Sequence, residues 1–194
     1  MLILASQSPR RRELLSMLGL DFTIVTADID ETMDPSLSVE DAVAEVCRKK
    51  AAAVGEKHPG DLIIAADTIV VLENKVLGKP HTEDEARDML RSLSGRHHTV
   101  MTAFCLWKNG KADTHVEKTH VHFRALTDAE IHAYIATGSP MDKAGAYGIQ
   151  DQAGIFVQAL EGDYYNVMGL PLCALVQKLR EQGVTVLGSA KASP

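Results

Sequence analysis

The chain has 194 residues, of which 45% are hydrophobic and 24% charged, a composition typical of a folded globular protein rather than a disordered one. Its formal net charge of −6 disfavours a broad surface for nucleic acid or anionic lipid, so any bound anion needs a local basic pocket. Three widely spaced cysteines form no disulfide or zinc framework, and no apolar stretch approaches the ~20 residues of a membrane span. We therefore expect a cytoplasmic protein without nucleic-acid or membrane partners.

Strand-like and helix-like segments alternate along the first half of the chain, which predicts a mixed α/β fold. Leu2–Ala5 has the character of a short buried strand, and Ser8 followed by Pro9 predicts the start of a helix that ends near Gly19. The further elements expected here are strands at Phe22–Val25 and Leu62–Leu72 and helices at Val39–Glu56 and Glu83–Leu93, the last opened by a capping box of Thr82 and Glu85.

The second half of the chain contains the strongest hairpin signal, Asn109-Gly110, between strands expected at Thr99–Trp107 and Asp113–Phe123. A capping box of Thr127 and Glu130 predicts a helix to about Ala136. A strand at Ile155–Leu160 and a helix from Pro171 to Glu181 complete the expected elements. We expect one domain over residues 1–190 and a frayed tail at 191–194.

The first candidate for chemistry is the basic start of the first helix, Ser8 followed by Arg10, Arg11 and Arg12. A helix N-terminus offers unpaired N–H groups and a partial positive charge, which attract phosphate. Arginines there oppose the helix dipole, and a bound polyanion would compensate for this. A solvated basic turn is an equally good interpretation of the spacing alone.

The second candidate is Asp67, which interrupts the apolar run Leu62–Leu72. Burial of an unpaired carboxylate costs several kcal/mol, so Asp67 needs a cation, a metal ion or hydrogen bonds. The alternative is a turn residue where the strand breaks. Neighbours on a regular strand point to opposite faces, so Asp67 and Thr68 can share a pocket only at a strand end or bulge.

Weaker candidates lie elsewhere in the chain. A carboxylate from the acidic segment at residues 28–34 could join Asp67 in holding Mg²⁺, although the segment alone favours a solvated acidic loop. Lys50 and Lys79 are expected to face solvent by default. The glycine-rich loop ending at Gln150 permits close approach to a ligand, and Gln150 can read a nucleobase edge, but the loop could also be a structural turn.

Taken together, these segments resemble the Maf family, the septum-formation-inhibitor-like nucleoside triphosphate pyrophosphatases. The resemblance runs from about Met1 to Gln182. It rests on a series of motifs in order: LASQSPRR (Leu4–Arg11), the Glu31 segment, Lys50-Ala51, AADT (Ala65–Thr68), GKP (Gly78–Pro80), LSGR (Leu93–Arg96), MTA (Met101–Ala103), DKAGAYGIQ (Asp142–Gln150) and VMGLP (Val167–Pro171).

The resemblance implies an elongated, twisted mixed sheet flanked by helices, with a deep cleft between two lobes, similar to the inosine-triphosphate pyrophosphatases. It implies hydrolysis of a nucleoside triphosphate between the α and β phosphates with Mg²⁺ or Mn²⁺, and a homodimer. The roles it implies are phosphate binding by Ser8, Arg10 and Arg11, catalysis by Asp67, Glu31, Lys50 and Lys79, and metal binding by Glu31 and Asp67.

Three positions indicate the branch within the family. A branch that resembles 7-methyl-GTP hydrolases carries Trp, Gln and Glu where this chain has Arg10, Thr68 and Gln150, and this chain has the pattern of the dTTP/UTP branch. The carboxamide of Gln150 offers a donor and an acceptor for the O4/N3–H edge of uracil or thymine. A relaxed pyrophosphatase for CTP or modified pyrimidine nucleotides, and a cell-division regulator that binds nucleotide without turnover, are the alternatives.

Overall fold

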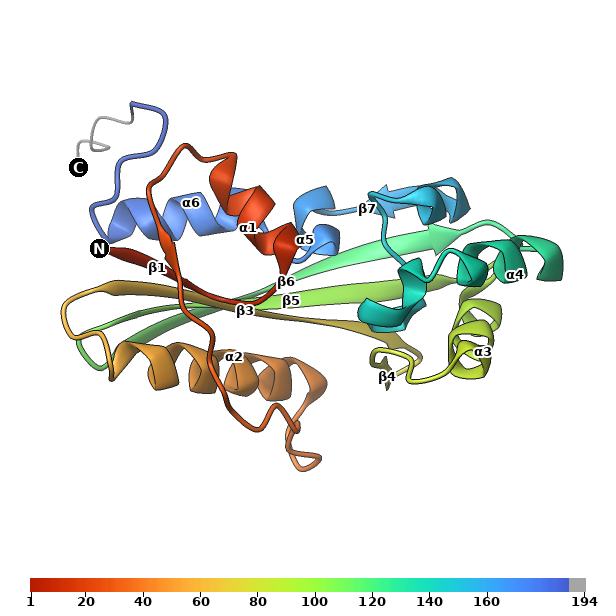
Figure 1. Ribbon diagram of the computed structural model, residues 1–194, viewed down its shortest axis with the longest axis horizontal. Coiled ribbons are helices and arrows are strands. Elements are labelled where there is room, and N and C mark those ends of the chain that lie inside the picture. Colours follow the sequence, from red (N-terminus) through yellow and green to blue (C-terminus); the bar gives the residue numbers. More distant parts are fainter. Residues whose placement is uncertain (189–194) are drawn as a thin grey trace. The chain divides into compact units, whose positions relative to one another are not determined.

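The computed structural model describes residues 1–188, which form a seven-stranded mixed sheet in the order β2-β1-β3-β5-β6-β7, with β4 paired to β3 (Figure 1). The strands are β1 (Leu2–Ala5), β2 (Thr23–Ile24), β3 (Leu62–Leu72), β4 (Lys75–Leu77), β5 (His97–Lys108), β6 (Lys111–Phe123) and β7 (Val157–Glu161). The helices are α1 (Pro9–Ser16), α2 (Val39–Gly55), α3 (Glu83–Leu93), α4 (Asp128–Ala136), α5 (Tyr164–Met168) and α6 (Leu172–Glu181), with short 3-10 helices η1 (Ser139–Asp142), η2 (Ala144–Ala146) and η3 (Gln152–Phe156).

Both strand orientations occur in the sheet. Strand β1 runs parallel to β2 and to β3, with Ile3 paired to Thr23 and to Ile63. Strands β4 and β7 run antiparallel to β3 and β6. This mixture confirms the α/β fold class expected from the sequence. Among the described residues, none of the helices has both the length and the apolar character that crossing a lipid bilayer requires.

Tertiary contacts divide the chain into two compact units. The first unit contains Met1–Asp67, Thr102–Glu117 and the described part of Gly169–Pro194, and the second contains Thr68–Met101 and Lys118–Met168. In the first unit, α2 covers one face of the strands while α1 and α6 cover the other (Figure 1). Its core is apolar on both sides of β3, where Ile63 and Ile64 are fully buried.

The second unit has a core of its own. Helix α3 packs on α4, and both contact the 3-10 helix η1. Tyr134 of α4, Phe123 of β6, Phe156 and Tyr147 are all buried, and their rings meet edge to face within this core. Such aromatic pairs stabilise a core beyond the area that they bury.

Most of the expected helix caps and turns are present in the structure. Ser8, Ser38 and Thr127 cap α1, α2 and α4, and Thr127 with Glu130 forms the full capping box. The hairpin turns at Asn109-Gly110, where both residues have the positive φ that a two-residue type I′ turn requires.

Three local expectations need correction. Thr82 caps α3, but the Glu85 carboxylate accepts from the N–H of His81 instead of that of Thr82, so this capping box is incomplete. The strand expected at Ile155–Leu160 begins only at Val157, because Asp151 caps η3 over the preceding residues. The short helix α5 had no predicted counterpart. The single domain over residues 1–190 and the cleft between lobes stay predictions, and residues 191–194 lie outside the described chain.

A buried histidine in the second unit makes stability depend on pH. His98 of β5 is 2% exposed, and its Nε2 lies 2.7 Å from the hydroxyl oxygen of Tyr147. Its Nδ1 atom is buried and has no hydrogen-bond partner among the described residues. Burial, with a smaller contribution from His122 and His97, lowers the pKa of His98 from 6.5 to about 4.

We expect protonation of the unfolded chain to destabilise the fold as the pH falls. The stabilising effect of neutral His98 is complete above pH 6.5 and is lost between pH 6.5 and about 4, because the unfolded histidine binds its proton first. Over this window the free energy of unfolding of the wild type should fall by about 3 kcal/mol more than that of His98→Gln. Urea denaturation at several pH values measures this, with exposed His132→Gln as the control. Parallel curves for wild type and His98→Gln would contradict it.

Candidate functional site

Lys50 is the centre of a charged cluster in the first unit. Its Nζ atom lies 2.7 Å from Oδ1 of Asp67 in β3 and 2.9 Å from Oε2 of Glu31, in the segment between β2 and α2. The Lys50 side chain is 9% exposed, whereas those of Asp67 and Glu31 are 18% and 57% exposed. Two carboxylates therefore compensate one ammonium group that has lost most of its water.

The position of Lys50 follows from the periodicity of α2. Val46 and Cys47 precede it by four and three residues and are both buried, so Lys50 lies on the same face of the helix. Its long aliphatic chain can pack there while the ammonium group reaches the carboxylates. The expectation that Lys50 faces solvent was wrong, because it took no account of this face.

Asp67 lies in the middle of β3, which runs without a break through Thr68 to Leu72. Residues on both sides of this pair are buried, while Asp67 and Thr68 are half-buried. On a regular strand such neighbours point to opposite faces. The carboxylate of Asp67 has the cation that its position required, namely Lys50.

Glu31 differs from two other acidic residues of its segment, Asp30 and Asp34, in the partner that its carboxylate binds. Asp30 and Asp34 each accept a hydrogen bond from the backbone N–H two residues later, on Thr32 and Ser36. Hydrogen bonds from the side chain, and to a smaller extent from the backbone, of Thr32 and of Ser36 lower the pKa of Asp30 and of Asp34, so both carboxylates are committed to local turns. Glu31 instead contacts Lys50. The residues of the segment alone did not indicate which of its carboxylates would do so.

Helix α1 belongs to the same unit as this cluster. Ser8 caps it by accepting from the N–H of Arg11, and the first turn contains arginines and no acidic residue. The Nε of Arg11 donates to the carbonyl oxygen of Gly169 at 2.8 Å. Burial lowers the pKa of the Arg11 guanidinium, and the negative charge of Asp67 opposes this shift. The bond to Gly169, 158 residues away, had no signal in composition or spacing.

The first unit therefore contains two carboxylates, Glu31 and Asp67, that contact Lys50 and whose charge also acts on Arg11 in the first turn of α1. The residues present fit a divalent cation, because Mg²⁺ is commonly held by one or two carboxylates together with substrate phosphates. Among residues 1–188, no group of three or more His, Cys, Asp or Glu side chains could hold a metal ion by itself. Phosphate oxygens would have to complete the coordination.

The second unit contains the remaining candidates. Lys79 is exposed in the loop Gly78–Pro80, and Gln150 is exposed in the turn that Asp151 N–H closes on the carbonyl oxygen of Gly148 at 3.2 Å. The N–H of Gly145 donates to the carbonyl oxygen of Gly78 at 3.0 Å. This bond joins the loop of Lys79 to the segment that leads to Gln150.

Comparison with known proteins shows a likeness of sequence and a likeness of fold. The family model described as Maf-like protein matches residues 1–182. Two proteins named dTTP/UTP pyrophosphatase, from Halalkalibacterium halodurans and from a Geobacillus species, are each 50% identical over 182 residues, which is 94% of this chain and 96% and 98% of theirs. A Bacillus cereus protein of the same name is 45% identical over 185 residues, 95% of this chain and 97% of that protein.

Solved structures add a likeness of fold. The Ham1 protein of Staphylococcus aureus has a TM-score of 0.52 at 12% identity, covering 94% of this chain and 99% of that one. A HAM1 protein from Coxiella burnetii has a TM-score of 0.52 at 16% identity, covering 93% and 98%. At these identities the likeness concerns the fold alone, and it supports the mixed α/β architecture.

Proposed function

We propose that this chain, which belongs to the Maf-like protein family, hydrolyses dTTP and UTP to the nucleoside monophosphate and pyrophosphate. The names of its relatives at 50% identity support the activity and the pyrimidine substrates. The observation in the structure that carries the proposal is the shared contact of Asp67 and Glu31 with the buried Lys50. Two carboxylates with adjacent cations are suited to a triphosphate and to the proton transfer that its hydrolysis requires.

The triphosphate binds to the basic groups in this mechanism. Ser8, Arg10 and Arg11 at the start of α1 supply hydrogen-bond donors and positive charge, and Lys79 contributes a further ammonium group. Such local charge allows an acidic protein to hold a polyanion. A divalent cation, Mg²⁺ or Mn²⁺, held by Glu31 and Asp67 would neutralise phosphate charge as the leaving group departs.

Asp67 is the general base in this mechanism. Lys50 orients its carboxylate through the 2.7 Å contact with Oδ1, and we assign Oδ2 as the proton acceptor. A water molecule gives its proton to Asp67 and attacks the α phosphorus. The bond between that phosphorus and the bridging oxygen then breaks, and pyrophosphate leaves with the bonding electron pair.

Base selection is assigned to Gln150, with Arg10 and Thr68. One carboxamide can donate to O4 and accept from N3–H of uracil or thymine. Gln150 is exposed at the tip of its turn, which leaves the side chain accessible to a ligand. We also propose a cytoplasmic location, which the three free cysteines support. The homodimer stays a prediction, which light scattering would check.

The products of UTP hydrolysis test the function directly. We expect UMP and pyrophosphate in the presence of Mg²⁺ or Mn²⁺, loss of activity in excess chelator, and its return when the metal ion is restored. Chromatography of a panel of nucleoside triphosphates should give the highest rates for dTTP and UTP. UDP and orthophosphate as primary products would contradict the mechanism, and full activity in chelator would contradict the metal roles of Glu31 and Asp67.

Asp67→Asn should lower kcat by at least roughly 10²-fold, because the side chain keeps its shape but can no longer accept the proton. Steady-state turnover of UTP measures this. Asp30→Asn, a matched change of an exposed carboxylate in a local turn, should leave kcat unchanged. If Asp67→Asn kept more than about a tenth of wild-type turnover, Asp67 would not be the base.

Gln150→Glu should lower kcat/KM for UTP and dTTP relative to GTP by roughly tenfold to 150-fold, or about 1–3 kcal/mol, because a carboxylate then opposes O4. The ratio of kcat/KM for UTP to that for GTP measures this in wild type and variant. Gln152→Glu makes the same exchange at an exposed position two residues away and serves as the control. An unchanged ratio would assign Gln150 a structural role.

A further inference from the structure

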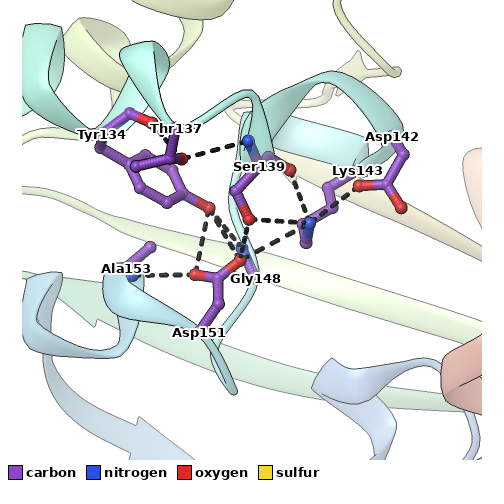
Figure 2. Close-up of polar contacts among 8 residues, drawn as sticks. All are labelled: Tyr134, Thr137, Ser139, Asp142, Lys143, Gly148, Asp151 and Ala153. Carbon is purple, nitrogen blue, oxygen red and sulfur yellow. Dashed lines mark hydrogen bonds and ion pairs between the residues drawn. The ribbon is translucent and has the colours of Figure 1, made fainter.

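A buried hydroxyl group ties together both ends of the turn that carries Gln150. Tyr134, on α4, is 3% exposed, and its hydroxyl oxygen accepts from the N–H of Gly148 at 3.2 Å (Figure 2). The same hydroxyl donates to the carboxylate of Asp151, whose two oxygens both lie 3.1 Å away. Gln150 lies between these two anchored residues in the chain.

The carboxylate of Asp151 receives further donors from the same region. Ser139 Oγ donates to it at 2.8 Å, the N–H of Ala153 donates at 2.8 Å, and Lys143 Nζ lies 3.5 Å away (Figure 2). Lys143 in turn donates to the carbonyl oxygen of Ser139 at 2.5 Å. A carboxylate with this many donors is held in one orientation, because movement would break several bonds at once.

The two ends of this turn, Gly148 and Asp151, are therefore fixed, while Gln150 between them is exposed. The N–H of Asp151 donates to the carbonyl oxygen of Gly148, which places Ile149 and Gln150 at the two central positions. Gly148 is buried and Gln150 is exposed. The network thus leaves the Gln150 side chain accessible while it fixes the backbone on either side.

The segment that leads into this turn is also fixed. Gly145 has φ +69°, and a Cβ there would lie 3.0 Å from Cγ2 of Val70, so its backbone packs closely on β3 in this unit. Tyr147 contacts His98 through the 2.7 Å bond between its hydroxyl and Nε2. The segment from Lys143 to Asp151 is therefore held at several places, and the bonds of the Tyr134 hydroxyl to Gly148 and Asp151 lie on either side of Gln150.

We propose that Tyr134 and Asp151 are positioning residues for base selection, holding the turn Gly148–Asp151 so that the Gln150 carboxamide is oriented toward the pyrimidine edge before the nucleotide binds. This inference rests on the proposed function and adds two residues that act through the position of Gln150. A polar side chain on a fixed turn loses less conformational entropy on binding than one on a mobile loop. Discrimination between nucleobases then depends on the bonds that hold Gly148 and Asp151 as well as on Gln150.

Tyr134→Phe removes a single oxygen atom and, with it, both bonds to the turn. We expect the ratio of kcat/KM for UTP to that for GTP to fall by about tenfold, mainly through a higher KM for UTP, while UMP and pyrophosphate remain the products. Thr127→Ala is the matched control, because it removes the cap of the same helix without touching the turn. The control should lower the Tm to a similar extent and leave the ratio unchanged.

Asp151→Asn is the second variant, and it tests the same inference if Tyr134→Phe does not fold. Calorimetric binding of UMP and GMP to wild type and variants gives a readout independent of turnover, and weaker binding of UMP alone supports the inference. Equal losses for both nucleotides, or an unchanged ratio beside a lowered Tm, would overturn it. A wild-type chain that releases no UMP and pyrophosphate from UTP would instead overturn the proposed function, so the two failures are distinguishable.

Discussion

The charge of Lys50 is the constraint on which the candidate site depends. An ammonium group on a side chain that is only 9% exposed is unfavourable unless negative groups compensate it, and Asp67 and Glu31 supply them from β3 and from the segment before α2. The same contacts bring the two carboxylates close to each other, which their own repulsion would oppose. The lysine therefore holds together two carboxylates, which are the oxygen ligands that a divalent cation bound to a triphosphate would use.

In the second unit, hydrogen bonds to a buried hydroxyl group and a carboxylate hold a turn of the backbone. The turn that carries Gln150 contains an accessible amide side chain, and its backbone needs partners that hold it in one conformation. The Tyr134 hydroxyl, the Asp151 carboxylate and Ser139 provide them from buried or half-buried positions. The first unit thus contains the charged cluster of Lys50, Asp67 and Glu31, while the second contains a polar turn whose backbone is fixed on both sides of Gln150.

Local structure was predictable from the sequence because caps and turns depend on residues within about four positions of one another. The caps Ser8, Ser38 and Thr127 and the turn Asn109-Gly110 are examples. The same reasoning failed at Glu85, where the carboxylate had two backbone N–H groups within reach and bonds that of His81. It also failed before β7, because the cap formed by Asp151 replaces the first residues of the expected strand with η3.

By itself, the sequence determined the mixed α/β class, most helix and strand positions and, through the series of motifs, the family and the candidate site residues. Only the tertiary structure decided that Lys50 is buried, that Glu31 alone of residues 28–34 is paired with it, and that Tyr134 anchors the turn of Gln150. The physical reason is the separation of the partners along the chain. Arg11 and Gly169, or Lys50 and Asp67, meet because strands and helices pack in a particular arrangement, and no local pattern encodes which distant groups that packing brings together.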